Sequence, residues 1–222
     1  MTPFRLAILI ITLLIGGHSA AQSQPLPVPD PPQLGAKGYM LMDFHSGRVL
    51  VSEQSDVRRD PASITKVMTA FVVFNELRSG DLAMDEQILV SEKAWRATGS
   101  RMFIEVGNRI AVEDLVRGMI IQSGNDASIA LAEHIAGSEA NFAALMNQYA
   151  ARLGMTNTHY INATGLPGDD HYSSAADTAT LVRALISQFP EYYRLYSERK
   201  FTWNNITQRN RNRMLWQDQS VD

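Results

Sequence analysis

The chain has 222 residues, of which 45% are hydrophobic and 19% charged, and these values are typical of a folded globular protein of one or two domains. The net charge of -3 is not the basic excess that nucleic-acid binding usually needs, so no nucleic acid partner is expected. The absence of cysteine excludes disulfides, thiolate metal ligands and a cysteine nucleophile.

The first 33 residues are predicted to lie outside the folded domain. A short basic start precedes the apolar run Leu6–Ile15 and small residues up to Ala21, which is the pattern of a signal peptide at residues 1–21. The run is shorter than the roughly 20 residues of a transmembrane helix, although a single anchoring span is the alternative. Residues 22–33 contain five prolines and are predicted to be an extended linker. We therefore expect an exported protein with its domain at residues 34–222.

The domain is predicted to begin with a β-hairpin and to continue mainly as helices. Strand-like runs within Gly38–Ser52 flank a turn that contains a glycine. Two strands are not stable alone, so other strands should complete this sheet. Helical spacing of apolar residues marks 62–77, 112–122, 126–136, 140–153 and 175–187; short strands are predicted within 100–110, a polar loop at 165–174, and extended pieces at 200–205 and 212–216. This order suggests one α/β unit with a helical insertion.

A Ser-x-x-Lys spacing opens the first predicted helix. Ser63 and Lys66 would share one helix face, with β-carbons about 5–6 Å apart. A serine hydroxyl needs a base to act as a nucleophile, and burial can lower the pKa of a lysine enough for that role. The helix start would also place N–H groups and partial positive charge where an oxyanion develops.

The spacing also permits a purely structural interpretation, with a serine near the helix cap and a lysine that extends to solvent. Ser197 and Lys200 have the same spacing in a charged stretch, where a solvated face is the simpler interpretation. The spacing alone therefore does not identify a nucleophile.

A second feature is Ser123-Gly-Asn125, between two apolar helical runs. Gly124 can turn the chain, and Asn125 or Asp126 can cap the next helix. A short turn of this kind can also hold a hydroxyl and a carboxamide in a cleft. Ser123 could then relay a proton to a leaving amine, and Asn125 could hold a substrate amide.

Together these two motifs, about sixty residues apart, resemble two of the three signatures of penicillin-recognising serine enzymes, S-x-x-K, S-D-N and K-T-G. The surrounding residues are similar to the serine-type D-alanyl-D-alanine carboxypeptidases, the low-molecular-mass penicillin-binding proteins, over about residues 36–222. The matching stretches are PASITKVMTAFVV, GSRMFIEVG, VEDLVRGMIIQSGNDASIALAEHIAG, FAALMNQYAARLGMTNTHYINATGLPG, SSAADTATLVRALI and FTWNNITQRNRNRMLW.

The resemblance implies an α/β (α+β) fold of the β-lactamase/transpeptidase type, an antiparallel sheet flanked by helices with a helical subdomain. It implies acyl transfer at the terminal D-Ala-D-Ala bond of peptidoglycan stem peptides in the bacterial periplasm or cell envelope. Ser63 would be the nucleophile, Lys66 its base and Ser123 the proton relay, while Asn125 would bind substrate. β-Lactams would acylate Ser63 as inhibitors.

The third motif departs from the family pattern, because no Lys-Thr-Gly occurs in residues 1–222. By resemblance, the segment that bears it would add the second oxyanion donor and the final sheet strands. A C-terminal β-domain and an amphipathic anchor on the inner-membrane surface often follow in the family. We therefore expect a truncated domain that is poorly stable and essentially inactive as it stands.

Two other functions stay open. A serine β-lactamase would need a deacylating glutamate in an E-x-x-L-N context, which no glutamate after Ser123 has. A non-catalytic module that binds peptidoglycan or β-lactams is the second, because the third motif is missing. No cofactor or metal is expected: the chain lacks a zinc signature such as H-E-x-x-H, and His45, His134, His159 and His171 are expected to be structural.

Overall fold

The computed structural model describes residues 30, 31 and 33–221. The predicted signal peptide (1–21) and most of the predicted linker (22–29 and 32) lie outside the described residues, as does residue 222. Gly35–Asp222 forms a unit of its own, separate from Met1–Leu34. The fold and the candidate site below belong to the Gly35–Asp222 unit.

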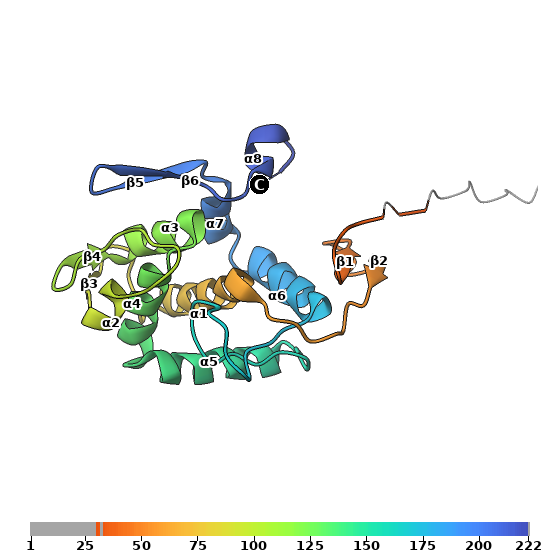
Figure 1. Ribbon diagram of the computed structural model, residues 1–222, viewed down its shortest axis with the longest axis horizontal. Coiled ribbons are helices and arrows are strands. Elements are labelled where there is room, and N and C mark those ends of the chain that lie inside the picture. Colours follow the sequence, from red (N-terminus) through yellow and green to blue (C-terminus); the bar gives the residue numbers. More distant parts are fainter. Residues whose placement is uncertain (1–29, 32, 222) are drawn as a thin grey trace, which may run out of the picture. The chain divides into compact units, whose positions relative to one another are not determined.

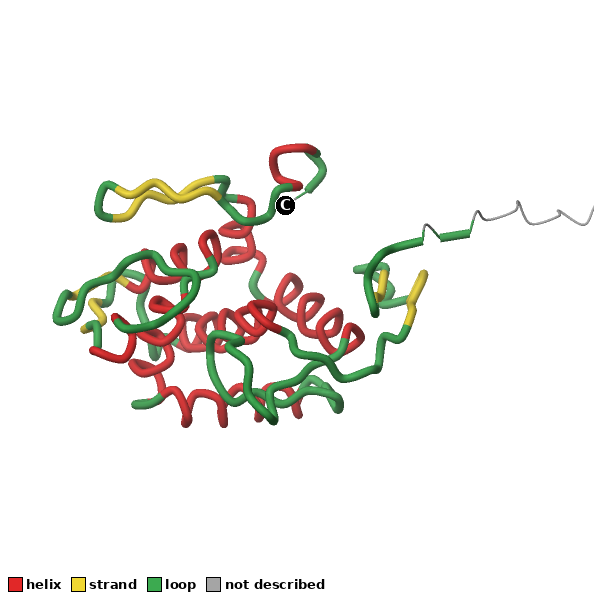
Figure 2. Tube along the Cα trace, in the orientation of Figure 1, coloured by secondary structure: helices red, strands yellow, loops and turns green. Residues whose placement is uncertain are grey.

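The five long helices, α1 and α3 to α6 in Figure 1 and red in Figure 2, occupy nearly the positions that the apolar periodicity predicts. The helix predicted at 112–122 has those bounds, and the others differ by a few residues at their ends. In chain order the elements are β1 (Tyr39–Met42), β2 (Val49–Glu53), the 3-10 turn η1 (Ala62–Ile64), α1 (Thr65–Ser79), β3 (Gln87–Leu89), α2 (Glu92–Trp95), β4 (Arg109–Ala111), α3 (Val112–Gln122), α4 (Asn125–Ala136), α5 (Glu139–Arg152), α6 (Ala175–Gln188), α7 (Pro190–Tyr193), the 3-10 turn η2 (Arg194–Ser197), β5 (Lys200–Trp203), β6 (Ile206–Arg209) and α8 (Met214–Gln217).

Helix α1 is the centre of the hydrophobic core. Buried residues occur on all its sides from Thr65 to Phe74, and it packs against α3, α4, α5 and α6 (Figure 1). A helix that is buried all round is typical of a core position. The helix ends at Gly80, whose φ of 83° suits a residue without a β-carbon. The core therefore fixes the start of α1, which contains Lys66 and directly follows Ser63.

The strands form three separate two-stranded antiparallel sheets, β1–β2, β3–β4 and β5–β6. The predicted hairpin at the start of the domain is β1–β2. Of the segment 100–110, where short strands were expected, only its end is a strand, β4, and it pairs with β3. The extended piece expected at 212–216 is instead largely α8 (Met214–Gln217). The one expected at 200–205 is β5 with the turn into β6.

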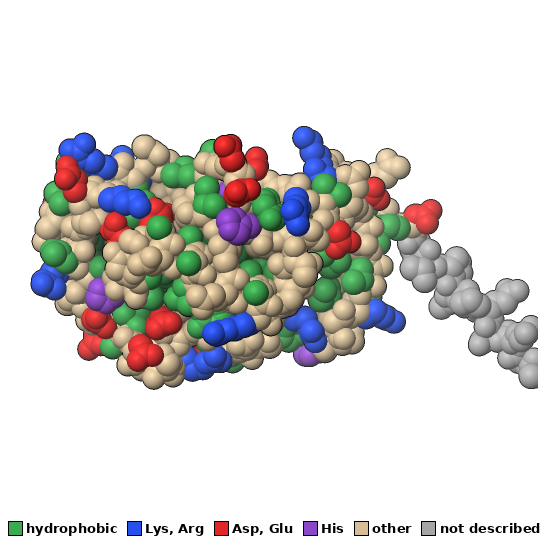
Figure 3. All heavy atoms as spheres, turned by 90° about the horizontal axis from the view of Figure 1, so that it is seen from below, with side chains coloured by type: hydrophobic (Ala, Val, Ile, Leu, Met, Phe, Trp, Pro, Cys, Tyr) green, Lys and Arg blue, Asp and Glu red, His purple; other side chains and the backbone are tan. Residues whose placement is uncertain are grey.

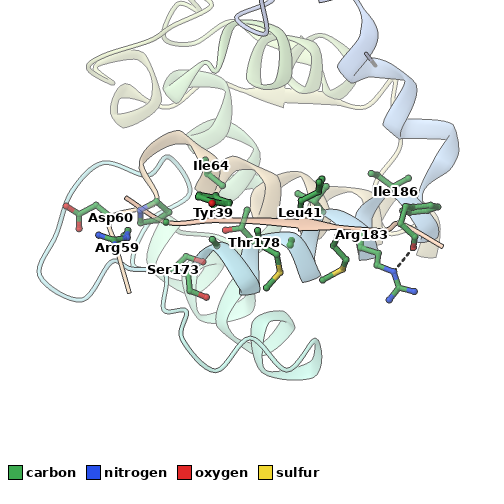
Figure 4. Close-up of a pocket in the computed structure, with 18 residues that line it drawn as sticks. Tyr39, Leu41, Arg59, Asp60, Ile64, Ser173, Thr178, Arg183 and Ile186 are labelled. Carbon is green, nitrogen blue, oxygen red and sulfur yellow. Dashed lines mark hydrogen bonds between the residues drawn. The ribbon is translucent and has the colours of Figure 1, made fainter. Parts of the chain in front are cut away.

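A groove of about 560 Å³ is lined by residues of β1 and α6, most of them apolar. Figure 4 shows this groove, with Tyr39 and Leu41 on the strand and Thr178 and Ile186 on the helix. Arg183 bounds one end, because its Nε donates to the carbonyl oxygen of Phe44 at 2.7 Å. In the described part of the chain β1 pairs only with β2, so its other edge carries no partner strand there.

The face in Figure 3 carries interspersed acidic and basic side chains, with hydrophobic ones between them. Within residues 30, 31 and 33–221, no helix has the length and apolar character needed to cross a membrane.

Candidate active site

The exposed side chain of Ser63 lies on η1, directly before α1. Its neighbour Ala62 has a φ of 46°, in the left-handed region that costs an alanine conformational energy. Gly165 packs closely against this turn, because a β-carbon on this glycine would stand 1.8 Å from the carbonyl oxygen of Ala62. The loop that contains Gly165 therefore presses directly on the turn that presents the serine.

Lys66 lies one helical turn beyond Ser63 and is only 6% exposed. Its Nζ donates to Ser63 Oγ at 3.3 Å and to the carbonyl oxygen of Thr164 at 2.7 Å. The structure thus brings together the two residues of the predicted Ser-x-x-Lys pair. An exposed hydroxyl with a buried amine beside it is an arrangement that can perform nucleophilic catalysis.

Burial lowers the pKa of Lys66 to about 8. The positive charge of Arg211 contributes to this lowering, while the negative charge of Asp126 opposes it. At pH 7 about one lysine in ten is then neutral, compared with roughly one in several thousand for an ordinary lysine. The electrostatic environment therefore makes Lys66 a usable base near neutral pH.

The loop that follows α5 is tied to α1 by buried hydrogen bonds. Thr69 Oγ1 donates to the carbonyl oxygen of Ala163 at 2.8 Å. His171 Nδ1 accepts from the N–H of Ile161 at 3.1 Å, so Nε2 carries the proton and donates to Thr65 Oγ1 at 2.8 Å. Burial lowers the pKa of His171, which favours this neutral form. These bonds keep the acceptor of Lys66 in place.

Ser123 and Asn125 lie at the turn between α3 and α4. Ser123 is half-buried and has a φ of 62°, a strained value for a serine. Asn125 is 5% exposed, and its Nδ2 donates to the carbonyl oxygen of Thr98 at 2.6 Å. That bond leaves Oδ1 as the atom of Asn125 that could accept from a substrate N–H. Among the described residues, neither side chain makes a hydrogen bond to Ser63 or Lys66.

Asp126, which the sequence suggested only as a helix cap, holds the loop before β4. Its carboxylate accepts the N–H groups of Met102, Phe103 and Ile104 at 3.0, 2.8 and 3.3 Å. The residue is 1% exposed, so these bonds offset the cost of a buried charge. The same carboxylate acts on the charge of Lys66, which connects the α3–α4 turn electrostatically to the serine and lysine.

Arg211 is a functional candidate that motif reasoning missed. It follows β6, and its backbone N–H donates to the carbonyl oxygen of Ile121 at 3.2 Å. Its Nη1 donates to Ser100 Oγ at 2.7 Å, and Ser100 Oγ donates to the carbonyl oxygen of Gln122. These contacts fix a guanidinium beside the end of α3, next to Ser123. In the sequence, Arg211 lies between two asparagines. This context forms no motif that would predict a position beside the end of α3.

The second Ser-x-x-Lys pair is split between two elements. Ser197 ends η2 and donates to the carbonyl oxygen of Arg194 at 2.8 Å, whereas Lys200 is exposed on β5. Among the described residues, no group of three or more His, Cys, Asp or Glu side chains is placed to hold a metal ion. His134 instead contacts Glu86 at 2.8 Å.

Solved structures with a similar fold define the class of protein first. Penicillin binding protein 5 from Haemophilus influenzae superposes with a TM-score of 0.84 at 42% identity, over 86% of this chain and 57% of that chain. Penicillin binding protein 6B from Escherichia coli gives a TM-score of 0.82 at 42% identity, over 87% of this chain and 62% of that one. The fold is therefore the transpeptidase fold of penicillin-binding proteins, as the motifs predicted.

Sequence relatives identify the family. The chain is 43% identical over 196 residues to the D-alanyl-D-alanine carboxypeptidase DacA of Escherichia coli, covering 85% of this chain and 48% of DacA. It is 45% identical over 192 residues to DacC of the same organism, covering 83% and 48%. A model of the D-alanyl-D-alanine carboxypeptidases, peptidase family S11, matches residues 25–222. The chain belongs to this family, and it spans about half the length of the curated relatives it matches.

Proposed function

We propose that this protein is a serine D-Ala-D-Ala carboxypeptidase that removes the terminal D-Ala from peptidoglycan stem peptides in the bacterial cell envelope. The observation that carries the proposal is the contact of the exposed Ser63 with the buried Lys66, 3.3 Å between Oγ and Nζ. Membership of the S11 family supplies the substrate class, and β-lactams are the expected inhibitors. The proposal includes association with the inner-membrane surface through a C-terminal anchor, which is taken from the family resemblance.

In the proposed reaction, Ser63 Oγ attacks the carbonyl carbon of the penultimate D-Ala while Lys66 Nζ takes the hydroxyl proton. The backbone N–H of Ser63 stabilises the oxyanion of the tetrahedral intermediate. The C–N bond then breaks, and the terminal D-Ala leaves as an amine that receives a proton through Ser123. Water finally hydrolyses the ester on Ser63 and restores the enzyme.

The lowered pKa of Lys66 supports its role as base, because a base with a pKa near 8 is partly neutral at the working pH. The Thr164 carbonyl, 2.7 Å from Nζ, orients the amine. Asn125 would hold the substrate amide through Oδ1, since its Nδ2 is engaged with Thr98. The roles of Ser123 and Asn125 rest on their position in the motif and on this geometry.

A test compares the 222-residue chain with DacA of Escherichia coli, using a diacylated Lys-D-Ala-D-Ala peptide and the chromogenic β-lactam nitrocefin. We expect D-Ala release by the 222-residue chain, as by DacA, and we expect Ser63→Ala to abolish it.

Nitrocefin turnover separates the carboxypeptidase from a serine β-lactamase. A carboxypeptidase should be acylated once and release product slowly, whereas a β-lactamase should turn nitrocefin over rapidly. If neither substrate reacts at Ser63 and a radiolabelled stem peptide still binds, a non-catalytic peptidoglycan-binding module becomes the better account.

A further inference from the structure

A cavity separate from Ser63 and Lys66 lies between the loop before β4 and the β5–β6 hairpin. It has a volume of about 370 Å³. Its lining combines two aromatic rings, two carboxamides and one carboxylate: Phe103, Trp203, Asn108, Asn204 and Glu105. The proposed reaction uses none of these side chains.

Phe103 is the most unusual residue of this cavity. Its φ is 68°, a left-handed value that is strained for a phenylalanine, and its side chain is 45% exposed. The buried carboxylate of Asp126 accepts its N–H at 2.8 Å and thereby holds the strained backbone in place. Backbone strain of this kind is found mostly at functional sites. Because the ring is largely exposed, packing in the core does not explain why the strain is kept.

The opposite wall is also preformed. Trp203 pairs with Ile206 at the end of the β5–β6 ladder, and the two residues between them, Asn204 and Asn205, have φ values of 46° and 62°. Positive φ at both central residues is typical of a tight type I′ turn. Gln208 Nε2 of this hairpin donates to the carbonyl oxygen of Arg101 at 2.9 Å, which attaches the hairpin to the loop of Phe103.

The chemistry of the lining suits a sugar. Aromatic faces are large, rigid apolar surfaces against which the C–H face of a pyranose can pack. Carboxamide and carboxylate groups donate to and accept from ring hydroxyls and N-acetyl groups. Glu105 and Asn108 lie close together, with Asn108 Nδ2 donating to Glu105 Oε2 at 3.5 Å, so both can address one ligand.

We propose that this cavity binds an N-acetylated amino sugar of the peptidoglycan glycan strand. The proposal rests on the proposed function for the identity of the glycan. The cavity is connected to the candidate active site through Asp126. This residue follows Asn125 in the sequence, and its carboxylate accepts the backbone N–H of Phe103.

The test measures binding of a peptide-free disaccharide, N-acetylglucosaminyl-N-acetylmuramic acid, to the 222-residue chain. Trp203 fluorescence is the signal, recorded in a background in which Trp95 and Trp216 are replaced by phenylalanine. We expect saturable binding that Phe103→Ala weakens at least about tenfold, a difference of about 1.4 kcal/mol. Phe103→Tyr should retain binding, because it keeps the ring, and Phe103→Leu, which keeps apolar bulk without the ring, should weaken it.

Two results would overturn the sugar site. One is a folded protein whose Trp203 signal does not respond to millimolar disaccharide; the other is equal affinity in Phe103→Ala, Phe103→Leu and the unchanged chain. Penicillin labelling of Ser63 separates this proposal from the proposed function, because Phe103→Ala should leave that labelling unchanged. Sugar binding without any reaction at Ser63 would support the sugar site and count against the carboxypeptidase.

Discussion

The carbonyl oxygen of Ala62 occupies the space that a side chain on Gly165 would need. A β-carbon at Gly165 would stand 1.8 Å from this oxygen and 3.0 Å from Thr65 Oγ1. The glycine also has a φ of 83°, which other residues rarely adopt. The loop after α5 can therefore approach the turn that carries Ser63 only because residue 165 has no side chain.

Gly165→Ala should displace the turn that carries Ser63. Gly154→Ala is the matched control, because Gly154 has a φ of 75° but open space around its α-carbon. Thermal unfolding should show a cost of about 1 kcal/mol for the control, from the left-handed backbone alone, and a larger cost for Gly165→Ala. Penicillin labelling should be lost only in Gly165→Ala; equal effects of the two substitutions would contradict the steric account.

Acylation of Ser63 should accelerate with pH because only neutral Lys66 can accept its proton. Burial places the pKa of Lys66 at about 8, so the rate should rise through pH 7 and level off above pH 9. The measurement is the second-order rate of labelling by a fluorescent penicillin between pH 6 and 10. A rate that does not change over this range would show that Lys66 is not the base.

Arg211→Gln should move this pH dependence toward higher pH. The guanidinium lowers the pKa of Lys66 through its positive charge, so its removal should raise that pKa and reduce the labelling rate at pH 7. Arg213→Gln is the control, because Arg213 is an exposed arginine two residues away. A slower rate without a shifted profile would instead indicate that Arg211 acts only by bonding Ser100 at 2.7 Å.

Burial of Lys66 should also make stability depend on pH. Its folded pKa of about 8 lies below the unfolded value of 10.5, so between these values the unfolded chain binds more protons and stability rises with pH. Relative to Lys66→Met, the unchanged chain should gain on the order of 3 kcal/mol from pH 7 to pH 10.5. Denaturant unfolding of both proteins measures this difference, and a difference that is constant with pH would contradict a lowered pKa.

Sequence patterns predicted the five long helices well, because their apolar residues recur at helical spacing, but they did not predict the four-residue helices α2, α7 and α8. The Ser63–Lys66 contact followed from the same helical geometry, since residues three apart share a face. The strands were harder to predict. Residues 102–104 have strand-like composition, but the carboxylate of Asp126 takes their N–H groups and leaves none for a sheet ladder.

The parts of the site that the sequence did not reveal come from distant segments. The Thr164 carbonyl that orients Lys66 is a backbone atom 98 residues away, so no residue type marks it. Arg211 contacts Ser100, 111 residues earlier in the chain, and its sequence neighbours give no motif. Such long-range placement depends on tertiary packing, which local periodicity does not encode.

The most direct test of the proposed mechanism is the site at which a β-lactam attaches. The 222-residue chain is incubated for hours with excess benzylpenicillin, digested and mapped by mass spectrometry, alongside Ser63→Ala and Ser197→Ala. The mechanism predicts a single penicilloyl adduct on Ser63, absent from Ser63→Ala and retained in Ser197→Ala, whose serine has the same Ser-x-x-Lys spacing. An adduct on another residue, or no adduct in the folded chain, would contradict the assignment of Ser63 as the nucleophile.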